Sequence, residues 1–390
     1  MALSGALAAG PASPSPRAVE GKLEKRSTAF LWVGWADRLA RPIEAAGAMR
    51  NLFVYEGPHA AHRAWAEAIG CEVPEEPALS RPGIVARFRT KGWYRRLSRA
   101  PMLVRRTIEM TARDYRPPLE VPDIVLFEGW RQTACARHFP GSFRVLIGAD
   151  WFPYVFHRNP RMIGYLRPFH LIVSVSEVHR SFIPADVNPN VAVVHPSMQF
   201  ARGTIGDGRD CAFVGDVFEV LKGVPASVRL FERAFGTDGR AFHVIGACDR
   251  SMAGKRAGSV TYHGRVSDEE LESLLRSSRY YVHWAEFDPH PVSTVEAMSH
   301  GLIPITSPTT GTHYLSVEVL GEGFDLSSVE RAADALVALD RTESWRPMRQ
   351  RCQEISERYT VERSQQAFRE AVLGAYDKWK GEKEKGQVQH

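Results

Sequence analysis

The residues best suited to chemistry lie between Tyr280 and Thr312, in the run YYVHWAEFDPHPVSTVEAMSHGLIPITSPTTGT. An apolar strand ends near Trp284, a loop with three titratable side chains follows, and a helix starts near Ser293. The free amides at such a helix start attract phosphate, because the helix dipole places positive partial charge there. Glu296 falls about one turn inside the helix, where a carboxylate can accept two vicinal hydroxyls, as an acidic residue does for ribose in other nucleotide folds. The run therefore predicts a site for a phosphate group beside a hydroxyl pair.

The elements that position this site are short apolar runs alternating with helical patterns. Strands are expected at 29–33, 52–55, 124–127, 144–147 and 171–175 in the first half, and at 212–214, 242–245, 260–262, 280–284 and 303–306 in the second. Strand–helix alternation at this spacing indicates parallel sheets covered on both faces. The expected fold class is α/β, with two doubly wound, Rossmann-like domains facing a central cleft. Ligands of such sheets bind beyond the carboxyl ends of the strands.

The helices have clear sequence signals. A stripe of apolar side chains at helical spacing follows Lys222 and Gly223, namely Val224, Val228, Phe231 and Phe235. Ser267 is the first residue of a capping box, in which its hydroxyl accepts the amide hydrogen of Glu270. Gly301 stands where the helix that starts near 293 should end. The stretch 188–198, which contains two prolines, is expected to link the two halves.

Length and composition limit the classes of protein that remain. A chain of 390 residues with 44% hydrophobic and 24% charged residues predicts about two globular domains and excludes a fibrous or wholly disordered chain. No run approaches the roughly 18 apolar residues that a membrane-spanning helix requires. The five cysteines are widely spaced and never form a CxxC pair, so neither a zinc site nor a disulfide framework is expected. The expected compartment is a reducing cytoplasm.

The positive charge of the chain is concentrated in one segment. Eleven Arg and Lys residues stand against two acids in residues 81–116, whereas the whole chain is only +5. Three interpretations remain open: a solvated helical face, an anionic membrane surface, or an acidic or phosphorylated acceptor. Pro101 interrupts any single long helix in the segment. Nucleic-acid binding is not expected, because no nucleic-acid motif accompanies the charge.

The run that contains Glu296 resembles a known family. The retaining GT-B glycosyltransferases of family 4 have a signature that reads Glu, seven residues, Glu and then Ala-Met-x-x-Gly-x-Pro. This chain has a similar pattern: Asp288, seven residues, Glu296 and then AMSHGLIP (297–304), with one extra residue before Pro. FVG (213–215) followed by KGV (222–224) resembles the FVG and KG of that family, and VTYHGRVSDEELESLL (260–275) resembles its strand–Gly–helix for the nucleobase. LIVSVSEVHRSF (171–182) and VAVVHPSM (191–198) look like the strand that leads into its interdomain linker. The resemblance covers about residues 29–378.

The resemblance implies roles for individual residues. Glu296 would hold the ribose of a nucleotide sugar, and Asp288 would contact the hydroxyls of the donor sugar in place of the usual Glu. Lys222 would neutralise the departing diphosphate, a point-charge role suited to an ammonium group. The amides near Val292 and Ser293 would bind phosphate.

Further residues are assigned to the nucleotide by the same resemblance. Gly215 belongs to the FVG motif, and Arg265 with Val266 lies in the nucleobase segment, where contacts are largely made by the backbone. Gly34, after the first strand, would let the backbone approach the diphosphate or the acceptor closely. Asp216 stands where the family usually has Arg, and it is either a structural cap or a contact to the ribose or base.

The sequence departs from the family pattern at the remaining candidate residues. Pro291 replaces a usual Gly, which removes one amide that would face phosphate. Ala149 stands where the family often has His, with Asp150 beside it. Asp150 either caps a turn or contacts substrate, and His290 either belongs to a surface turn or takes part in catalysis.

Together these patterns predict a GT-B glycosyltransferase that transfers a sugar from a UDP-, GDP- or dTDP-sugar to an acceptor hydroxyl with retention, without a metal or other cofactor. The acceptor is a glycan, a lipid-linked molecule or a small molecule, and the expected location is the cytoplasm, with the protein either free or peripheral at the inner face of the membrane. The alternatives are a noncatalytic sugar-nucleotide-binding protein and a GT-B sugar-nucleotide epimerase. The expected organisation is a disordered arm (1–26), an acceptor domain (27–197), a donor domain (203–365), a helix that crosses back to the first domain (366–381) and a flexible tail (382–390).

Overall fold

The computed structural model describes residues 49–55, 59–73, 79–80, 114–115, 121–249 and 251–386. The chain divides into two compact units, residues 1–48 and 49–390, and all described residues belong to the second unit. The predicted strand at 29–33, Gly34, the arm at 1–26 and nearly all of the basic segment 81–116 therefore lie outside the described residues.

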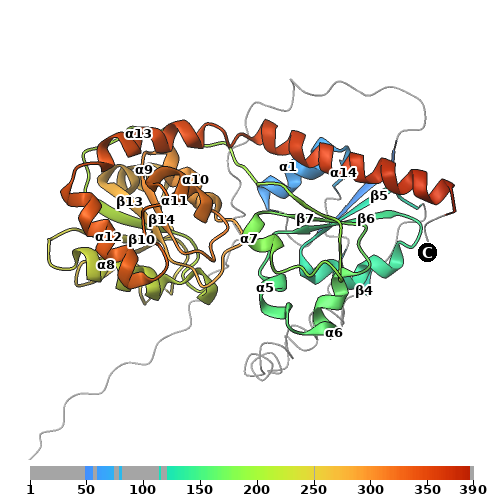
Figure 1. Cartoon of the computed structure of the whole chain (residues 1–390), viewed down its shortest axis with the longest axis horizontal. Helices are drawn as coiled ribbons and strands as arrows, with labels where there is room; N and C mark the ends of the chain where they lie inside the picture. Colours follow the sequence, from blue (N-terminus) through green and yellow to red (C-terminus); the bar gives the residue numbers. More distant parts are fainter. Residues whose placement is uncertain are drawn as a thin grey trace, which may run out of the picture. The chain divides into compact units, whose positions relative to one another are not determined.

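The first sheet is parallel throughout the described residues (Figure 1). Its strands are β1 (Asn51–Val54), β2 (Cys71–Glu72), β5 (Ile124–Glu128), β6 (Phe143–Gly148), β7 (Leu171–Ser174) and β8 (Val191–Val193), in the order β2-β1-β5-β6-β7-β8. The side chains of β5 alternate between two apolar cores: Val125 packs in one and Leu126 in the other. Burial on both faces explains why this strand is a continuous apolar run.

Short helices connect the strands of the first sheet. They are α1 (Ala60–Ala68), the 3-10 helix η1 (Trp130–His138), α5 (Phe152–Phe156), α6 (Pro160–Ile163), the 3-10 helix η2 (Gly164–Leu166) and α7 (Glu177–Arg180). Two further strands, β3 (Leu79–Ser80) and β4 (Asp114–Tyr115), pair with each other in antiparallel fashion. The stretch 188–198 was expected to be only a linker, but it contributes β8, which pairs with β7. Val191 and Val193 explain the difference, because β-branched residues favour an extended strand.

The second sheet has the strand order typical of a Rossmann fold. Its strands are β9 (Asp210–Val214), β10 (Phe242–Ile245), β11 (Lys255–Ala257), β12 (Val260–Gly264), β13 (Ser278–His283) and β14 (Ile303–Thr306), in the order β11-β12-β10-β9-β13-β14. All pairs are parallel except β11 with β12. The chain builds outward from β9 through β10 and β12 and then crosses to β13 on the other side of β9. The order reverses between β9 and β13, which is where such sheets bind ligands.

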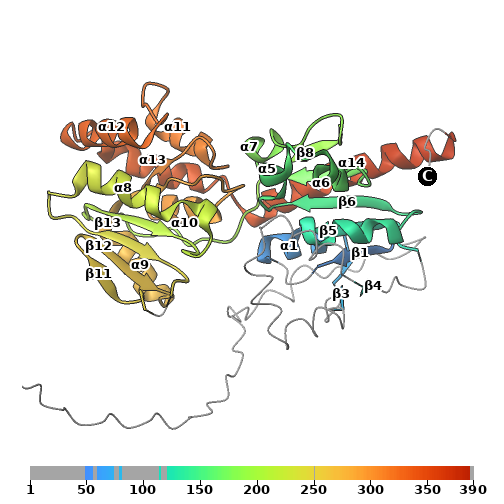
Figure 2. The same cartoon turned by 90° about the horizontal axis from the view of Figure 1, so that it is seen from below.

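Helices cover both faces of the second sheet. They are the 3-10 helix η3 (Val220–Lys222), α8 (Val224–Phe235), α9 (Asp268–Ser277), α10 (Val292–Ser299), α11 (His313–Leu320), α12 (Val329–Arg341) and α13 (Trp345–Ser356). Figure 2 shows α8 and α12 on one side of this sheet and α9 on the other. Accordingly, Tyr280 lies in the core with α8 and α12, and its neighbour Tyr281 lies with Leu275 of α9.

The predicted helix signals correspond to observed helices. The Ser267 hydroxyl accepts a hydrogen bond from the Glu270 amide at 3.2 Å and caps α9. In α8 the buried stripe contains Leu230, whereas the predicted Val228 is only partly buried. Gly301, with φ +75°, follows the C-cap of α10, as the sequence predicted.

The last helix, α14 (Val361–Glu384), packs on α1 and the first sheet (Figure 1). The Trp65 ring stacks on Phe368 with centroids 4.9 Å apart, and Trp65 Nε1 donates a hydrogen bond to Ser364 Oγ at 2.8 Å. The helix is longer than the predicted 366–381 and includes residues 382–384 of the expected tail. Among the described residues, no helix is long and apolar enough to cross a membrane.

Candidate functional site

The ends of β9 and β13 are joined at the point where the strand order of the second sheet reverses. Ser293, in the first turn of α10, donates a hydrogen bond from its hydroxyl to Val214 O at the end of β9, at 3.0 Å. The Tyr281 hydroxyl lies 2.8 Å from Ser293 Oγ and 2.9 Å from His283 Nδ1. These contacts position the start of α10 beside the carboxyl ends of both strands.

Gly223 allows a close approach that determines where Lys222 lies. Its φ is +65°, and a Cβ at this position would lie 2.1 Å from Trp284 O, so only glycine fits without displacement. Nearby, the Phe287 amide donates a hydrogen bond to Leu221 O at 3.1 Å. The turn that carries Lys222 is thereby attached to the loop that follows β13.

Lys222, Asp288 and His283 form a compact polar cluster. Lys222 Nζ and His283 Nε2 each lie 3.3 Å from Asp288 Oδ2. The Asp288 side chain is 7% exposed and the Lys222 side chain 28% exposed. Burial alone would raise the pKa of Asp288, but the Lys222 ammonium and the His283 imidazole outweigh it and hold this pKa below its usual range. Asp288 is therefore an anion at neutral pH, and the ammonium beside it remains open to solvent.

Glu296 lies in α10 without a cationic partner. Among the described residues, no side chain or backbone group donates a hydrogen bond to its carboxylate. Burial, followed by the nearby charge of Asp268, raises the pKa of Glu296 to about 7. An unpaired, half-buried carboxylate on this face can accept the hydroxyls of a ligand.

The start of α10 leaves two amides for an anion. Val292 and Ser293 are its first two residues, and the amides of a first helical turn have no acceptor within their own helix. Pro291 precedes them as the N-cap, and its ring nitrogen carries no hydrogen. Pro291 therefore removes the amide that a glycine would have offered at this end of the helix.

The remaining donor-side candidates lie at the carboxyl ends of β9 and β12. Gly215 approaches Gly246 closely, because a Cβ on Gly246 would lie 2.0 Å from Gly215 O. Asp216 is exposed, and its Oδ1 accepts a hydrogen bond from the Phe218 amide at 2.9 Å, so it caps its own turn. Arg265 is exposed and Val266 half-buried, in the loop between β12 and α9.

His290 is a buried residue of the same loop as Asp288. It is 6% exposed, so its interpretation as a surface turn is wrong. Its ring lies 5.2 Å from the ring of His195, and neither ring nitrogen has a hydrogen-bond partner among the described residues. Burial, and secondarily the neighbouring His195, lowers the pKa of His290 to about 3. His290 is therefore neutral at physiological pH.

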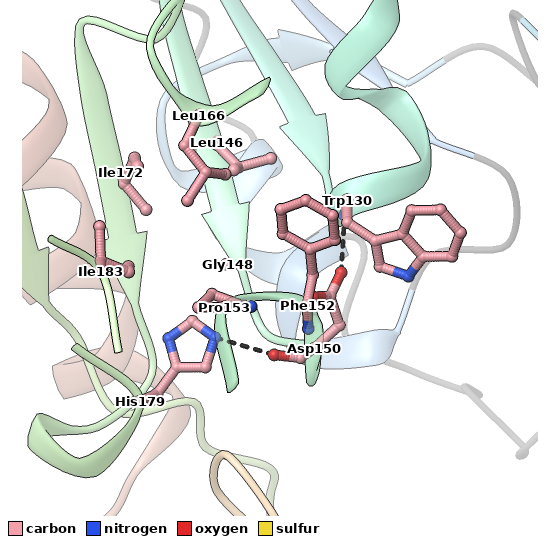
Figure 3. A pocket seen from close by; sticks show the side chains of 10 residues that line it. All are labelled: Trp130, Leu146, Gly148, Asp150, Phe152, Pro153, Leu166, Ile172, His179 and Ile183. Carbon is pink, nitrogen blue, oxygen red and sulfur yellow. Dashed lines mark hydrogen bonds between the residues drawn. The ribbon is translucent and has the colours of Figure 1, made fainter. Parts of the chain in front are cut away.

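Asp150 lies at the end of β6 and caps the turns around it. Its Oδ2 accepts a hydrogen bond from the Trp130 amide at 2.6 Å, and its Oδ1 accepts one from the Phe152 amide at 2.9 Å. His179 Nε2 lies 2.8 Å from Asp150 O. Figure 3 shows the contacts of Asp150 with Trp130 and His179 at the edge of a small, mainly apolar pocket. Burial raises the pKa of Asp150 to about 6, although both amides oppose the shift. The structure matches the capping alternative for this residue.

Sequence reasoning missed several polar residues near these strand ends. His283 was not singled out, although it is the last residue of an apolar strand and directly precedes the loop of Asp288. In the first half, His59, His62 and Glu128 were also missed, and Glu128 Oε1 contacts both His62 Nδ1 and the His59 amide. The signal available for Glu128 was an acidic residue at the end of the apolar run IVLF.

Comparison with known proteins agrees with the sequence resemblance. Residues 208–341 match the family model described as glycosyl transferases group 1. No curated protein matches the chain. The matched segment includes β9 to α12, and thus Lys222, Asp288 and Glu296. The segment that carries these motifs therefore matches a glycosyltransferase family model, as the resemblance predicted.

Solved structures extend the likeness to both sheets. The crystal structure of Anabaena Alr3699/HepE in complex with UDP and glucose has a TM-score of 0.57 at 12% identity, over 84% of this chain and 100% of that chain. The complex of the same protein with UDP-glucose gives 0.56 at 12% identity, with the same coverage. The crystal structure of TarM gives 0.51 at 12% identity, over 65% of this chain and 54% of that chain. These likenesses show the fold, and the expected GT-B class is confirmed.

Proposed function

We propose that this chain is a retaining glycosyltransferase of the EC 2.4 class, which transfers a sugar from a nucleotide-diphosphate sugar to an acceptor hydroxyl. The observation that carries the proposal is the Lys222–Asp288 pair at 3.3 Å beside the start of α10, within the segment that matches the glycosyltransferase family model. Residues 203–365 would bind the donor and residues 27–197 the acceptor.

The cluster suits the departure of a diphosphate. Lys222 and the amides of Val292 and Ser293 would stabilise the negative charge that develops on the leaving phosphate. In the proposed step, the bond between the anomeric carbon and the phosphate oxygen breaks, and a bond to the acceptor oxygen forms on the same face of the sugar. The acceptor proton passes to the departing diphosphate, so no second carboxylate is needed as a base. Asp288, fixed as an anion, would orient the hydroxyls of the donor sugar.

The donor would be held by its ribose and its base. Glu296 would accept the two ribose hydroxyls, and the backbone near Arg265 and Val266 would contact the base. A uridine nucleotide is the first choice among UDP-, GDP- and dTDP-sugars, supported by the UDP and UDP-glucose complexes of the structurally similar HepE. The acceptor is proposed to be a glycan, a lipid-linked molecule or a small molecule. The basic segment 81–116 is proposed to contact an anionic membrane surface at the cytoplasmic face.

Release of nucleotide diphosphate from a panel of UDP-, GDP- and dTDP-sugars tests the proposal. Lys222→Ala should lower the rate about 10²–10³-fold, the range seen when a transition-state contact is lost. Glu296→Ala should lower kcat/KM about tenfold or more, because it removes the hydrogen bonds between a charged group and the ribose hydroxyls. Lys255→Ala is the matched control, because Lys255 is exposed on β11 at the edge of the same sheet. The assay uses cell extract as the source of acceptor. If the wild type releases no nucleotide diphosphate from any donor, the result would count against a transferase.

A noncatalytic sugar-nucleotide-binding protein is the second candidate. Two features favour it: Asp216 exposes an anion where the family usually has a cation, and Pro291 removes a phosphate-facing amide. Thermal shift measurements distinguish the two functions. Stabilisation by UDP without turnover of any donor would select the binding protein, and the absence of any nucleotide binding would reject both.

A further inference from the structure

The first sheet has its own reversal of strand order. Among the described residues, β1 lies between β2 and β5, so the chain builds to one side of β1 and then to the other. The carboxyl ends of β1 and β5 therefore border the position where a doubly wound sheet binds a ligand. Polar side chains lie at or near these two strand ends, namely Glu128 at the end of β5 and His59 and His62 after β1, and they take no part in the proposed donor site.

Glu128, the last residue of β5, is the centre of this polar group. Its Oε1 lies 2.8 Å from His62 Nδ1 and accepts a hydrogen bond from the His59 amide at 2.9 Å. The His62 and Glu128 side chains are 9% and 13% exposed. The other carboxylate oxygen, Oε2, receives no hydrogen bond from the described residues. The pair is thus held rigidly through one oxygen, which leaves the second as an acceptor.

Gln132 supplies a second acceptor at the same turn. The residue is only 2% exposed, and its Oε1 has no hydrogen-bond partner among the described residues. A Cβ on Gly129, whose φ is +73°, would lie 4.0 Å from Gln132 Oε1 and 2.7 Å from Asp150 Oδ2. An unsatisfied buried acceptor costs about 1–3 kcal/mol, which a hydroxyl donor from a ligand would offset.

The type of ligand follows from the chemistry of these groups. The free acceptor oxygens of Glu128 and Gln132 lie at a turn that carries carboxylate charge, which repels phosphate and carboxylate groups. These oxygens match the hydroxyl donors of a polyol. Trp151 is half-buried directly after Asp150, with its ring 5.7 Å from the ring of Trp130. An aromatic ring one residue from the Asp150 turn would offer an apolar surface to a sugar bound there.

The charge of Lys222 is the smallest of the causes that lower the pKa of His59, after desolvation and the charge of His62, and the charge of Glu128 opposes the shift.

We propose that Glu128, oriented by His62, and Gln132 bind the hydroxyls of a sugar unit in the acceptor, so that the acceptor is itself a glycoside. The inference rests on the proposed glycosyl transfer and names the class of its second substrate. It assigns Glu128 and Gln132 as binding residues and His62 as a positioning residue.

Saturation-transfer NMR with methyl α-glucoside, methyl α-mannoside, methyl α-galactoside and methyl N-acetyl-β-glucosaminide, in the presence of UDP, tests this assignment. Glu128→Gln and Gln132→Met should each weaken binding of the preferred glycoside about tenfold, the effect of one lost hydrogen bond to a charged or buried group. Glu67→Gln is the matched control, because Glu67 forms an exposed pair with Arg63 on α1. Affinity for UDP, measured by calorimetry, should stay within twofold in all three variants, which also shows that they fold.

The outcomes separate the two proposals. Failure of the wild type to bind any of the four glycosides, or equal binding by the wild type and both variants, overturns the glycoside assignment. Absence of UDP binding by the wild type overturns the donor site instead, and the glycoside measurement without UDP then still decides the assignment of Glu128 and Gln132.

Discussion

Two carboxylates of the proposed donor site have pKa values that their surroundings move in opposite directions. Asp288 has Lys222 and His283 beside it and stays ionised, whereas Glu296 is half-buried without a cation beside it among the described residues and has a pKa of about 7. Such a separation assigns different tasks to the two groups. Asp288 acts as a constant anion, and Glu296 changes charge in the neutral range.

The first prediction concerns the pH dependence of ribose binding. Burial raises the pKa of Glu296 from 4.5 to about 7, so folding favours its protonated form. Ribose hydroxyls that donate to the carboxylate favour the ionised form, so affinity should rise with pH through about 7. Calorimetry with uridine, which carries no phosphate to titrate, should show an increase of about tenfold between pH 6 and pH 8.

Glu296→Gln provides the control for this prediction, because the amide keeps the shape and cannot ionise. Its affinity for uridine should be independent of pH over the same range. Without ligand, the raised pKa also affects folding. The free energy of unfolding of the wild type, compared with that of Glu296→Gln, should fall as pH rises from 4.5 to about 7. A uridine affinity with the same pH dependence in both proteins would exclude Glu296 as the ribose ligand.

At the scale of elements, the turn between η3 and α8 determines whether Lys222 reaches Asp288. Gly223 combines a positive φ with a close approach to Trp284 O. The second prediction is that Gly223→Ala destabilises the protein by more than 2 kcal/mol and lowers UDP affinity, because both steric conflict and backbone strain oppose the turn. Urea denaturation and calorimetry measure the two effects.

Gly239 offers a matched control for the alanine substitution. It also has a positive φ, +80°, but nothing lies within 4 Å of its Cβ position. Gly239→Ala should therefore cost only about 1 kcal/mol and leave UDP affinity unchanged. Equal losses of stability in the two variants would show that the contact with Trp284 contributes nothing.

The sequence predicted the elements of the second half better than it predicted contacts. Strands β10 and β14 were predicted with the correct bounds, because each is a short apolar run next to glycine or a polar residue. The contact between Lys222 and His283, through Asp288, was not predicted. This contact requires β9 and β13 to be neighbours in the sheet. The order of strands in a sheet produces no repeating pattern in the sequence from which it could be predicted.

The first half was harder to interpret for a related reason. Gln132 lies in a 3-10 helix that begins directly after Gly129, and its neighbours form no amphipathic pattern. Only the fold reveals that its side chain is buried beside Asp150. Asp150 could be interpreted from sequence as a cap or as a ligand-binding residue, and its two amide partners identify it as a cap.

At the scale of the whole molecule, charge is the feature that the fold does not explain. The excess of positive charge lies in residues 81–116, nearly all of which are outside the described residues. The third prediction is that the full chain sediments with vesicles of 30% phosphatidylserine and that Arg95, Arg96, Arg105 and Arg106→Ser lowers the partition at least tenfold. Each basic residue near such a surface contributes about 1 kcal/mol. Neutral phosphatidylcholine vesicles are the control, and an unchanged partition of the quadruple variant would reject the membrane contact.

The docking of α14 determines the order in which the two halves can finish folding during synthesis. The second sheet is covered by helices α8 to α13, which all emerge from the ribosome within residues 224–356. The core of the first sheet also needs Phe368, Val372 and Tyr376 of α14, which are made long after β8. The half that is translated first is therefore completed last, and its partly covered core is exposed to chaperones and proteases until the final helix arrives.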